Sequence, residues 1–392
     1  MCIRAAALAL AIAASASAAN LAETQRVLDR IKAVSKEGTG NQEAGAAWRE
    51  LVSHGGAAIV PTLAAMRDAS PTASNWLRSA VNAIVEKEKA AGRKLPSDDL
   101  LAFLKDTKND PVARRLAYEV LVEADPKTPD RLLPGLLDDP SNEIRRDAVA
   151  AALTKAEKLT GDAAKAEYTR LLGVVRDEEQ ANTIATNLAK LGAKPDLKKH
   201  FGIVIQWMLA GPFDGAKGTA FGKAYEPEKK VDLSATYKGK GETDVKWVPH
   251  TAELEPKEEK KEKDEVAKAA VENVGLVNLN KALANHKDAV AYAYTVIESD
   301  KERPAEIRFG CINAVKVFLN GKEVFSREEY HHGMRFDQYV GKGTLKPGKN
   351  EILVKVVQND QKEPWAQVWQ FQLRLSDATG GALPVKEALQ TN

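Results

Sequence analysis

The sequence predicts a mixed α + β chain in which an N-terminal α-solenoid of helical hairpins, residues 20–200, precedes an antiparallel β-sandwich, residues 201–392. Three observations favour this fold class. Apolar residues recur at helical spacing through the Ala- and Leu-rich first half. A short motif returns there at intervals of 37 and 31 residues, which is typical of repeat proteins. From Phe201 onward β-branched and aromatic residues replace the helical pattern.

The first residues predict an export signal. Arg4 is followed by an unbroken run of Ala, Leu and Ile over residues 5–14, and the small residues at 16–19 suit a signal peptidase. We therefore expect a signal peptide over residues 1–19 and a mature protein in the periplasm or outside the cell. The apolar run is shorter than the roughly 20 residues of a bilayer span, so no membrane span is expected.

The helical half contains three similar breaks, each an N-cap residue followed by a proline suited to the first turn of a helix. Each break should open a helix that contains the recurring tetrad of Arg, any residue, Ala and a large apolar or aromatic residue. The alanine lets neighbouring helices approach closely. The breaks are Ser70-Pro71, Asp110-Pro111 and Asp139-Pro140, and the tetrads begin at Arg78, Arg115 and Arg146.

One repeat resembles a known family. Residues 139–148 are similar to the second helix of a HEAT-type repeat, and residues 132–137 are similar to the first. The resemblance implies an extended surface for a protein partner. A simple helical bundle is the alternative for this half of the chain.

Turn signals organise the second half. Asn320-Gly321 stands between two β-forming runs and predicts a type I′ hairpin with positive φ. Pro347-Gly348 predicts another turn before a strand over residues 351–357. In the last strand, Trp369, Phe371, Leu373 and Leu375 alternate with Gln370, Gln372 and Arg374, so we expect one buried face and one solvated face.

The β half also resembles a family. The segments 207–213, 245–247, 291–293, 317–322 and 345–350 together are similar to the galactose-binding-like jelly roll. The resemblance implies a jelly-roll sandwich that binds carbohydrate or another protein. Related modules often carry Gly and Asp before the hairpin strand, whereas residues 310–314 here read Gly-Cys-Ile-Asn-Ala, so an ion site at this place is not expected.

A run of mixed charges at about 253–269 cannot enter a core. We interpret it as a solvated loop inserted between strands, with a recruitment tail as the alternative.

Composition and motifs argue against several function classes. The formal net charge of +2 gives no reason to expect nucleic acid. Motifs for metal sites, phosphate loops and hydrolase elbows are absent, so we expect no metal, no cofactor and no enzyme. Cys311 is interpreted as a small core residue. Asp214, Glu226 and Asp232 near the β entry remain the only carboxylates considered for a glycosidase pair.

Four residues are the candidates for ligand binding. Trp365 follows a proline in a polar stretch, where an exposed ring could stack on a sugar or anchor a protein. The alternative is a tryptophan that caps the end of the sandwich core. Tyr330, His331 and His332 form a polar aromatic cluster, although adjacent histidines on a strand would point to opposite faces. The sequence thus favours an exported adaptor that binds protein and carbohydrate. A structural spacer of an envelope assembly is the alternative, and a glycan-active hydrolase is a third.

Overall fold

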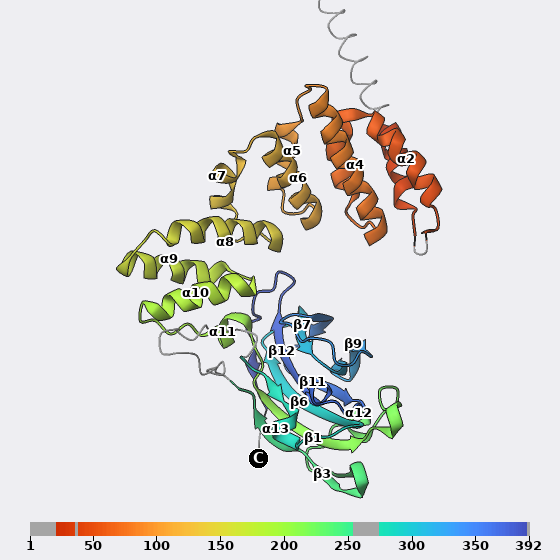
Figure 1. Cartoon of the computed structure of the whole chain (residues 1–392), viewed down its shortest axis with the longest axis vertical. Coiled ribbons are helices and arrows are strands. Elements are labelled where there is room, and N and C mark those ends of the chain that lie inside the picture. The colour runs from red at the N-terminus through yellow and green to blue at the C-terminus, as the bar shows by residue number, and fades with distance from the viewer. Residues whose placement is uncertain (1–20, 36–37, 254–273, 390–392) are drawn as a thin grey trace, which may run out of the picture. The chain divides into compact units, whose positions relative to one another are not determined.

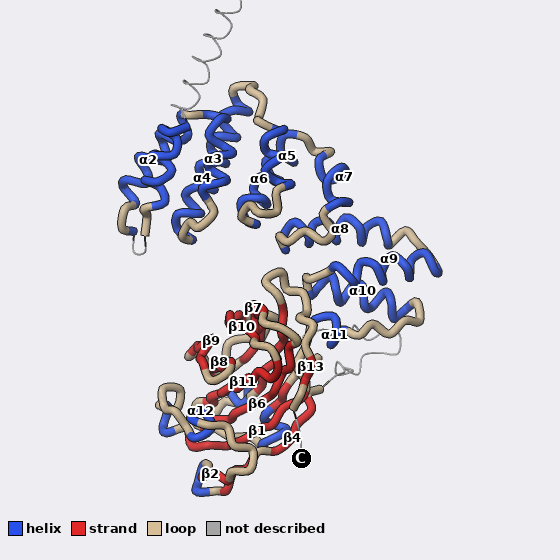
Figure 2. The backbone as a smooth tube through the Cα atoms, turned by 180° about the vertical axis from the view of Figure 1, so that it is seen from behind, coloured by secondary structure: helices blue, strands red, loops and turns tan. Residues whose placement is uncertain are grey.

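The computed structural model describes residues 21–35, 38–253 and 274–389 (Figure 1). The predicted leader and nearly all of the predicted charged loop lie outside these residues. The chain divides into two compact units, Met1–Ala151 and Ala152–Asn392, so that the helices after residue 151 group with the sheets. Helices and antiparallel sheets are both present, which confirms the prediction of a mixed α + β chain (Figure 2). Within the described ranges, no helix is long and apolar enough to cross a membrane.

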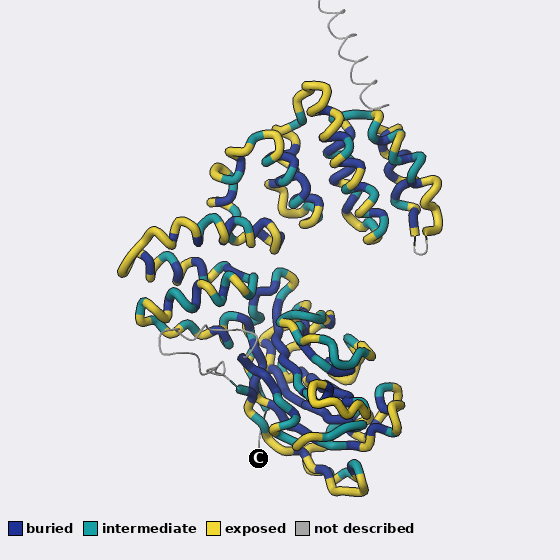
Figure 3. The backbone as a smooth tube through the Cα atoms, in the orientation of Figure 1, coloured by how far each residue is buried: buried dark blue, intermediate teal, exposed yellow. Residues whose placement is uncertain are grey.

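Helices of the first unit lie side by side, and each buries one stripe against its neighbours (Figure 3). Two of the predicted caps are confirmed, because Ser70 Oγ accepts from Ala73 N at 3.1 Å and Asp110 Oδ1 accepts from Val112 N at 2.9 Å. A helix covers residues 21–32, and the labelled elements are α2 (Asn41–Ser53), η2 (Gly55–Ala58), α3 (Ile59–Ala65), α4 (Pro71–Ala90), α5 (Ser97–Lys105), α6 (Pro111–Ala124), α7 (Thr128–Leu132), η3 (Leu133–Gly135) and α8 (Asn142–Ala156).

Asp139 has a different role from the predicted one. Helix α8 begins at Asn142, and the Asp139 carboxylate instead accepts from Arg114 of α6, at 2.9 Å from Nη1 and 2.6 Å from Nη2. The two side chains are 1% and 2% exposed, and Ser141 N also donates to Asp139 Oδ1. A buried arginine therefore occupies the acceptor that the sequence pattern assigned to a helix cap.

The polar sides of α4, α6 and α8 are joined by ion pairs. Arg78 of α4 pairs with Glu119 of α6 at 2.7 Å. Arg115 of α6 pairs with Glu119 on its own helix and with Asp147 of α8. The alanines of the three tetrads are buried behind these pairs, as predicted; they are Ala80, Ala117 and Ala148. Arg78 and Arg115, the first two of the recurring arginines, thus link α4, α6 and α8 along one side of this unit.

The second unit contains three short helices followed by two main sheets. The helices are α9 (Gly161–Val174), α10 (Glu178–Lys190) and α11 (Leu197–Phe201). The larger sheet has the order β4-β1-β6-β11-β8-β9, with β13 also paired to β6, and the smaller has the order β10-β7-β12-β5. A separate pair, β2 and β3, and the helical turns η4, α12, η5, α13 and η7 lie in the connections.

The bounds of these elements are β1 (Gln206–Asp214), η4 (Ala216–Gly218), α12 (Glu226–Lys229), β2 (Thr236–Lys238), η5 (Lys240–Glu242), β3 (Asp244–Lys246), β4 (Val248–Thr251), β5 (Val277–Asn278), α13 (Leu279–Leu283), β6 (Ala289–Ser299), β7 (Arg303–Cys311), β8 (Ala314–Leu319), β9 (Lys322–Arg327), β10 (Tyr339–Leu345), β11 (Gly348–Gln358), η7 (Pro364–Gln367), β12 (Gln370–Ser376) and β13 (Lys386–Glu387).

A shared apolar layer joins the two sheets. The ring of Trp207 on β1 meets that of Phe371 on β12 edge to face, with centroids 5.2 Å apart. Cys311 is fully buried, and burial raises the pKa of its thiol to about 12, in keeping with its interpretation as a core residue. The predicted hairpin is confirmed, since Asn320 and Gly321 have φ of 51° and 78° between β8 and β9.

Two asparagines connect the turn of this hairpin to the turn before β11. Asn320 Nδ2 donates to Asn350 Oδ1 at 2.9 Å, and Glu351 N donates to Asn320 Oδ1 at 3.0 Å. Asn350, which is fully buried, also receives a bond from Lys346 N at 2.9 Å and donates to Lys346 O at 2.8 Å. Together these bonds satisfy backbone groups of Lys346 and Glu351 and connect the turn before β11 to the Asn320 side chain.

Strand β12 departs from the predicted alternation, because its polar face is covered as well. Gln372 and Arg374 are 3% and 1% exposed. The Arg374 guanidinium bonds Asp337 at 2.6 Å from Nε, donates to Phe201 O of α11 at 3.0 Å, and lies 5.3 Å from the Phe201 ring. Helix α11 and the loop that carries Asp337 therefore form a second layer that the strand pattern alone does not show.

Connections between β1 and β4 cover the outer face of the larger sheet. Lys355 on β11 is fully buried there, and its Nζ donates to Lys223 O at 2.6 Å, Phe221 O at 3.3 Å and Glu228 Oε1 at 2.9 Å. Tyr292 of β6 donates to the same Glu228 oxygen. Burial lowers the pKa of Lys355, and the Glu228 carboxylate opposes that shift.

His200 at the end of α11 should make the stability of the second unit depend on pH. Burial, with the charges of Arg176 and Arg374, lowers its pKa from 6.5 to about 4. As the pH falls, His200 in the unfolded chain takes up a proton before His200 in the folded chain does, which favours unfolding. The stability that the folded protein has from this difference is complete above about pH 6.5 and is lost as the pH falls toward 4. Acid lowers the unfolding free energy of the wild-type protein, and we expect His200→Gln to reduce that loss by at most about 3 kcal/mol.

Urea unfolding of the two full-length proteins at pH 7.5, 5.5 and 4.5 measures the effect. A constant difference in unfolding free energy between wild type and His200→Gln over this range would contradict the assignment. His286→Gln is the comparison, because this half-buried histidine lies in the loop after α13, where its Nε2 is 2.9 Å from Leu283 O.

Candidate functional site

Three of the four candidate residues, Trp365, Tyr330 and His331, gather where β6 begins and β11 ends, near the pair formed by Ala289 and Gln358. Trp365 lies on η7, which follows β11, and its side chain is 59% exposed. Among the large apolar residues that are exposed in the described part of the chain, Trp365 alone is aromatic. An exposed indole at this place provides a flat surface for a ligand.

His331 lies against Trp365. Their ring centroids are 5.6 Å apart with an interplanar angle of 89°, and the centroid of the Tyr330 ring is 6.2 Å from that of His331. His331 N donates to Ile312 O at 2.9 Å, and the residue adopts φ of 58°. The loop between β9 and β10 thus brings Tyr330 and His331 to Trp365 across 34 residues of sequence.

Asn359 completes this group, and the sequence analysis missed it. Its Oδ1 lies 2.7 Å from His331 Nε2 and also accepts from Gln361 N at 3.2 Å. Its backbone carbonyl accepts from Asp288 N at 2.6 Å, which links the group to the start of β6. An amide that follows directly on a strand end is the available signal, but nothing in the sequence pairs it with His331.

The buried side-chain amides of Asn313 and Gln358 bond the backbone of η7 and of the residue that follows it. Gln358 Nε2 donates to Ala366 O at 3.1 Å, and Asn313 Nδ2 donates to both Gln358 Oε1 at 2.9 Å and Val368 O at 3.1 Å. Asn313 and Gln358 are each 1% exposed. Trp365 is therefore presented on a turn whose backbone is fixed by the core.

His332 occupies a separate place. Its Nδ1 lies 2.9 Å from Gln338 Nε2, and its ring meets Tyr339 edge to face at 6.0 Å. Tyr339 OH is 3.2 Å from His332 Nε2. The structure thus brings Trp365, Tyr330 and His331 together and directs His332 toward β10.

Tyr330 is half-buried and packs against the apolar cluster on the outer face of the larger sheet. Burial, with the nearby carboxylates of Glu328 and Asp288, raises the pKa of its phenol to about 12. The phenol is therefore uncharged at neutral pH, where it can offer a hydrogen bond but no nucleophile.

The three carboxylates considered for a glycosidase pair have local structural roles. Asp214 Oδ1 accepts from Ala216 N at 2.7 Å, Glu226 pairs with Lys229 at 2.7 Å, and Asp232 Oδ1 accepts from Ser234 N at 3.0 Å. In the ranges that the structure covers, no three His, Cys, Asp or Glu side chains gather as metal ligands.

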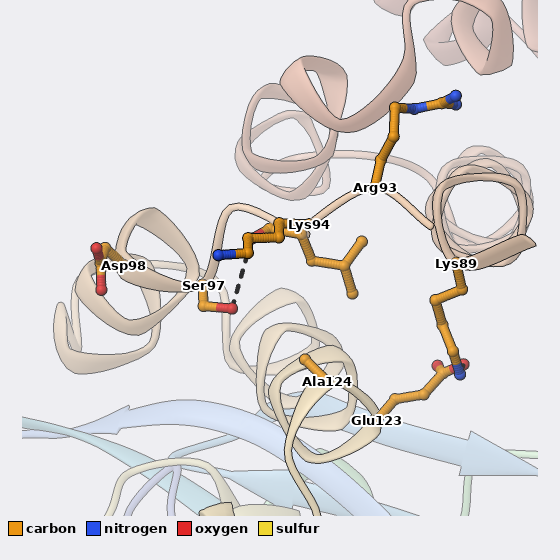
Figure 4. Close-up of a pocket in the computed structure, with 8 residues that line it drawn as sticks. Lys89, Arg93, Lys94, Ser97, Asp98, Glu123 and Ala124 are labelled. Atoms are coloured by element: carbon orange, nitrogen blue, oxygen red, sulfur yellow. Dashed lines mark hydrogen bonds and ion pairs between the residues drawn. The ribbon is translucent and has the colours of Figure 1, made fainter. Parts of the chain in front are cut away.

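A hollow of about 420 Å³ lies in the first unit, between the end of α4, the start of α5 and the end of α6 (Figure 4). Lys89 pairs with Glu123 across it at 2.5 Å, and Arg93 points away from the other labelled side chains toward its partner Glu88. Its lining residues are Lys89, Arg93, Lys94, Leu95, Ser97, Asp98, Glu123 and Ala124. The hollow contains none of the residues singled out from the sequence.

Comparisons with known proteins give no family. No family model matches the chain, and no significant match occurs among curated proteins. Among solved structures, an anti-sigma factor domain-containing protein aligns with 46% of this chain and 76% of its own at 8% identity and a TM-score of 0.21. A GH31 alpha-xylosidase from Xanthomonas citri aligns with 26% of this chain and 14% of its own at 15% identity and a TM-score of 0.17.

A beta-glucosidase from Kluyveromyces marxianus aligns with 76% of this chain and 35% of its own, at 8% identity and a TM-score of 0.25. This chain therefore spans much less than two thirds of the two glycosidases. TM-scores this low carry no argument about fold or function.

Proposed function

We propose that this chain is an exported, non-enzymatic adaptor. Its helical half is a HEAT-like solenoid that binds a protein, and its β half is a galactose-binding-like jelly roll that binds carbohydrate at Trp365. Export rests on the order of Arg4, the apolar run and the small residues at 16–19.

The exposure of Trp365 carries the proposal for the β half. Its side chain is 59% exposed, while buried amides fix the turn beneath it and His331 lies against it. An aromatic ring held on a fixed backbone is pre-organised for contact with a ligand, which favours a binding module over a spacer. Stacking of an aromatic ring on the apolar face of a sugar accounts for this arrangement.

Ion pairs that join consecutive helices support the solenoid. Arg78, Arg115 and Glu119 link α4, α6 and α8 in sequence, and Arg114 bonds Asp139 of the following repeat. Such nearest-neighbour links are typical of repeat proteins, whose extended surfaces bind other proteins.

The alternative function is that of a structural spacer in an envelope assembly, and a glycan-active hydrolase is the third candidate. The local roles of Asp214, Glu226 and Asp232 give the hydrolase no support from those residues. One variant separates the adaptor from the spacer.

Replacing Trp365 by Ala should weaken carbohydrate binding by about 2 kcal/mol, or roughly thirtyfold, because the stacking surface is lost. Folding stability should change by less than about 1 kcal/mol, since the ring is mostly exposed. Affinity electrophoresis of the full chain through gels with galactomannan, xylan or a soluble β-glucan measures binding, and a urea melt measures stability.

Val340→Ala is the control, because this exposed valine lies on β10 away from η7. No retardation of the wild-type protein by any of the three polysaccharides would favour the spacer. Retardation that is the same for wild type and Trp365→Ala would place the carbohydrate site elsewhere.

A further inference from the structure

The hydrogen bonds around Asn359 determine which nitrogen of His331 carries a proton. A backbone N–H can only donate, so the Asn359 side-chain atom that faces Gln361 N at 3.2 Å is the oxygen. Asn359 Nδ2 correspondingly donates to Gln361 Oε1 at 3.0 Å. His331 Nε2, 2.7 Å from the same Asn359 oxygen, must therefore be the donor of that bond.

The other nitrogen of the ring has no hydrogen-bond partner among the described residues. His331 Nδ1 is shielded from solvent and bonds none of them. In the neutral ring with its proton on Nε2, that atom needs no acceptor, whereas a proton on Nδ1 would be an unsatisfied buried donor. Asn359 thus fixes both the tautomer and the orientation of the imidazole that lies against Trp365.

Charge near the ring bears on the class of sugar. The loops over residues 328–338 and 359–369, which carry Tyr330, His331 and Trp365, contain five acidic and two basic side chains. Two of the acids are paired with arginines outside these loops, which leaves Glu328, Asp360 and Glu363 beside Arg335 and Lys362. No Lys or Arg bonds His331, Asn359 or Tyr330 among the interactions of the described residues. A carboxylate or sulfate on a ligand would meet net negative charge and no cationic partner here.

Resting on the proposed carbohydrate function, we infer that Asn359 is a positioning residue that holds His331 as the Nε2–H tautomer behind Trp365, and that the platform so fixed selects uncharged saccharides over anionic ones. Asn359 itself need not touch the ligand. Its effect comes through the imidazole, which limits the orientations that the indole can adopt before binding.

Variants at two positions test the positioning role. Asn359→Ala removes the acceptor and should weaken retardation by galactomannan, xylan or β-glucan about tenfold. Asn359→Asp keeps an oxygen for His331 Nε2 and for Gln361 N, so binding should return to within about threefold of wild type. Combining His331→Ala with Asn359→Ala should add little to the His331→Ala loss, because the amide acts through the ring. Gln206→Ala, an exposed amide on β1, is the control and should bind as wild type.

A second measurement does not depend on any ligand. Long-range nitrogen–proton NMR spectra report the tautomer of each histidine, with the His331 signals identified by their loss in His331→Gln. The Nε2–H form in wild type and a mixture of forms in Asn359→Ala are expected. An Nδ1–H form in wild type, or equal weakening by Asn359→Asp and Asn359→Ala, would overturn the positioning role even if carbohydrate binds.

Selection for charge is tested with alginate and polygalacturonate beside the neutral polysaccharides. At low salt we expect at least tenfold weaker retardation by the anionic polymers, with a smaller difference at 0.5 M NaCl because salt screens the repulsion. Equal retardation by both classes would overturn the selectivity. Absence of binding to every polymer, together with the expected His331 tautomer, would instead reject the proposed carbohydrate function.

Discussion

Arg114→Met should destabilise the helical unit by about 3–5 kcal/mol, because it leaves the carboxylate of Asp139 buried without its partner. Both side chains are almost fully buried, and the guanidinium makes two bonds to that carboxylate. It also donates from Nε to Leu104 O at 2.7 Å, so a third acceptor loses its donor. Hydrogen exchange of peptides from α6 and α8 in the full chain, together with urea unfolding, measures the loss.

Two further variants define the origin of this effect. The double variant Arg114→Met with Asp139→Asn removes both charges and keeps an oxygen for Ser141 N, so it should recover a large part of the loss. Arg131→Met breaks an exposed pair with Asp125 in the same unit and should cost less than about 1 kcal/mol. Equal effects of Arg114→Met and Arg131→Met would show that the burial of the pair is unimportant.

Lys355→Met should destabilise the β unit by about 3 kcal/mol or more, since Glu228 and two backbone carbonyls then lose a buried donor. The loss should be local at first, because these partners all belong to the connection that covers the outer face of the larger sheet. Limited proteolysis should cut residues 219–230 in the variant faster than in the wild-type protein.

The exposed pair of Lys238 and Asp244 supplies the matched control within the same connection. Lys238→Met should leave both the cleavage rate and the unfolding free energy nearly unchanged. Adding Glu228→Gln to Lys355→Met should slow the cleavage again by removing the stranded charge. Cleavage within β7 or β12 in place of the connection would mean that Lys355 stabilises the whole sandwich and does not anchor its cover.

Local signals in the sequence predicted local structure well. Ser70 and Asp110 cap their helices because the bonds join residues two or three positions apart. The turn at Asn320-Gly321 follows from the backbone preferences of those two residues.

Asp139 has the same sequence pattern as Ser70 and Asp110 but a partner 25 residues away, and its role could not be predicted from its neighbours. The face of β12 with Gln372 and Arg374 was expected to be solvated for a related reason, since the strand carries no sign of the helix and loop that cover it. Buried polar residues of this kind depend on partners from distant segments.

In the candidate site, too, local features could be predicted from the sequence and contacts between distant segments could not. The polar neighbours of Trp365 favoured its exposure, which the structure shows. His331 and His332 lie on a loop between β9 and β10, so the alternation expected of a strand does not explain why they face different partners. The contact of His331 with Trp365 and its bond to Asn359 depend on how two loops meet at one end of the sheet. Sequence spacing contains no information on that meeting.

The two asparagines that tie the turns of β8 and β11 have a consequence for how this sheet can change over evolutionary time. A slip of one residue between neighbouring strands would move every core side chain of the strand to the opposite face of the sheet. Here Asn320 and Asn350 fix the alignment of β8 with β11 at the end of the strands, because their side chains bond each other and Asn320 Oδ1 also accepts from Glu351 N. Apolar side chains further along these strands can therefore change in size and shape during evolution without changing the alignment, as long as the two asparagines are kept.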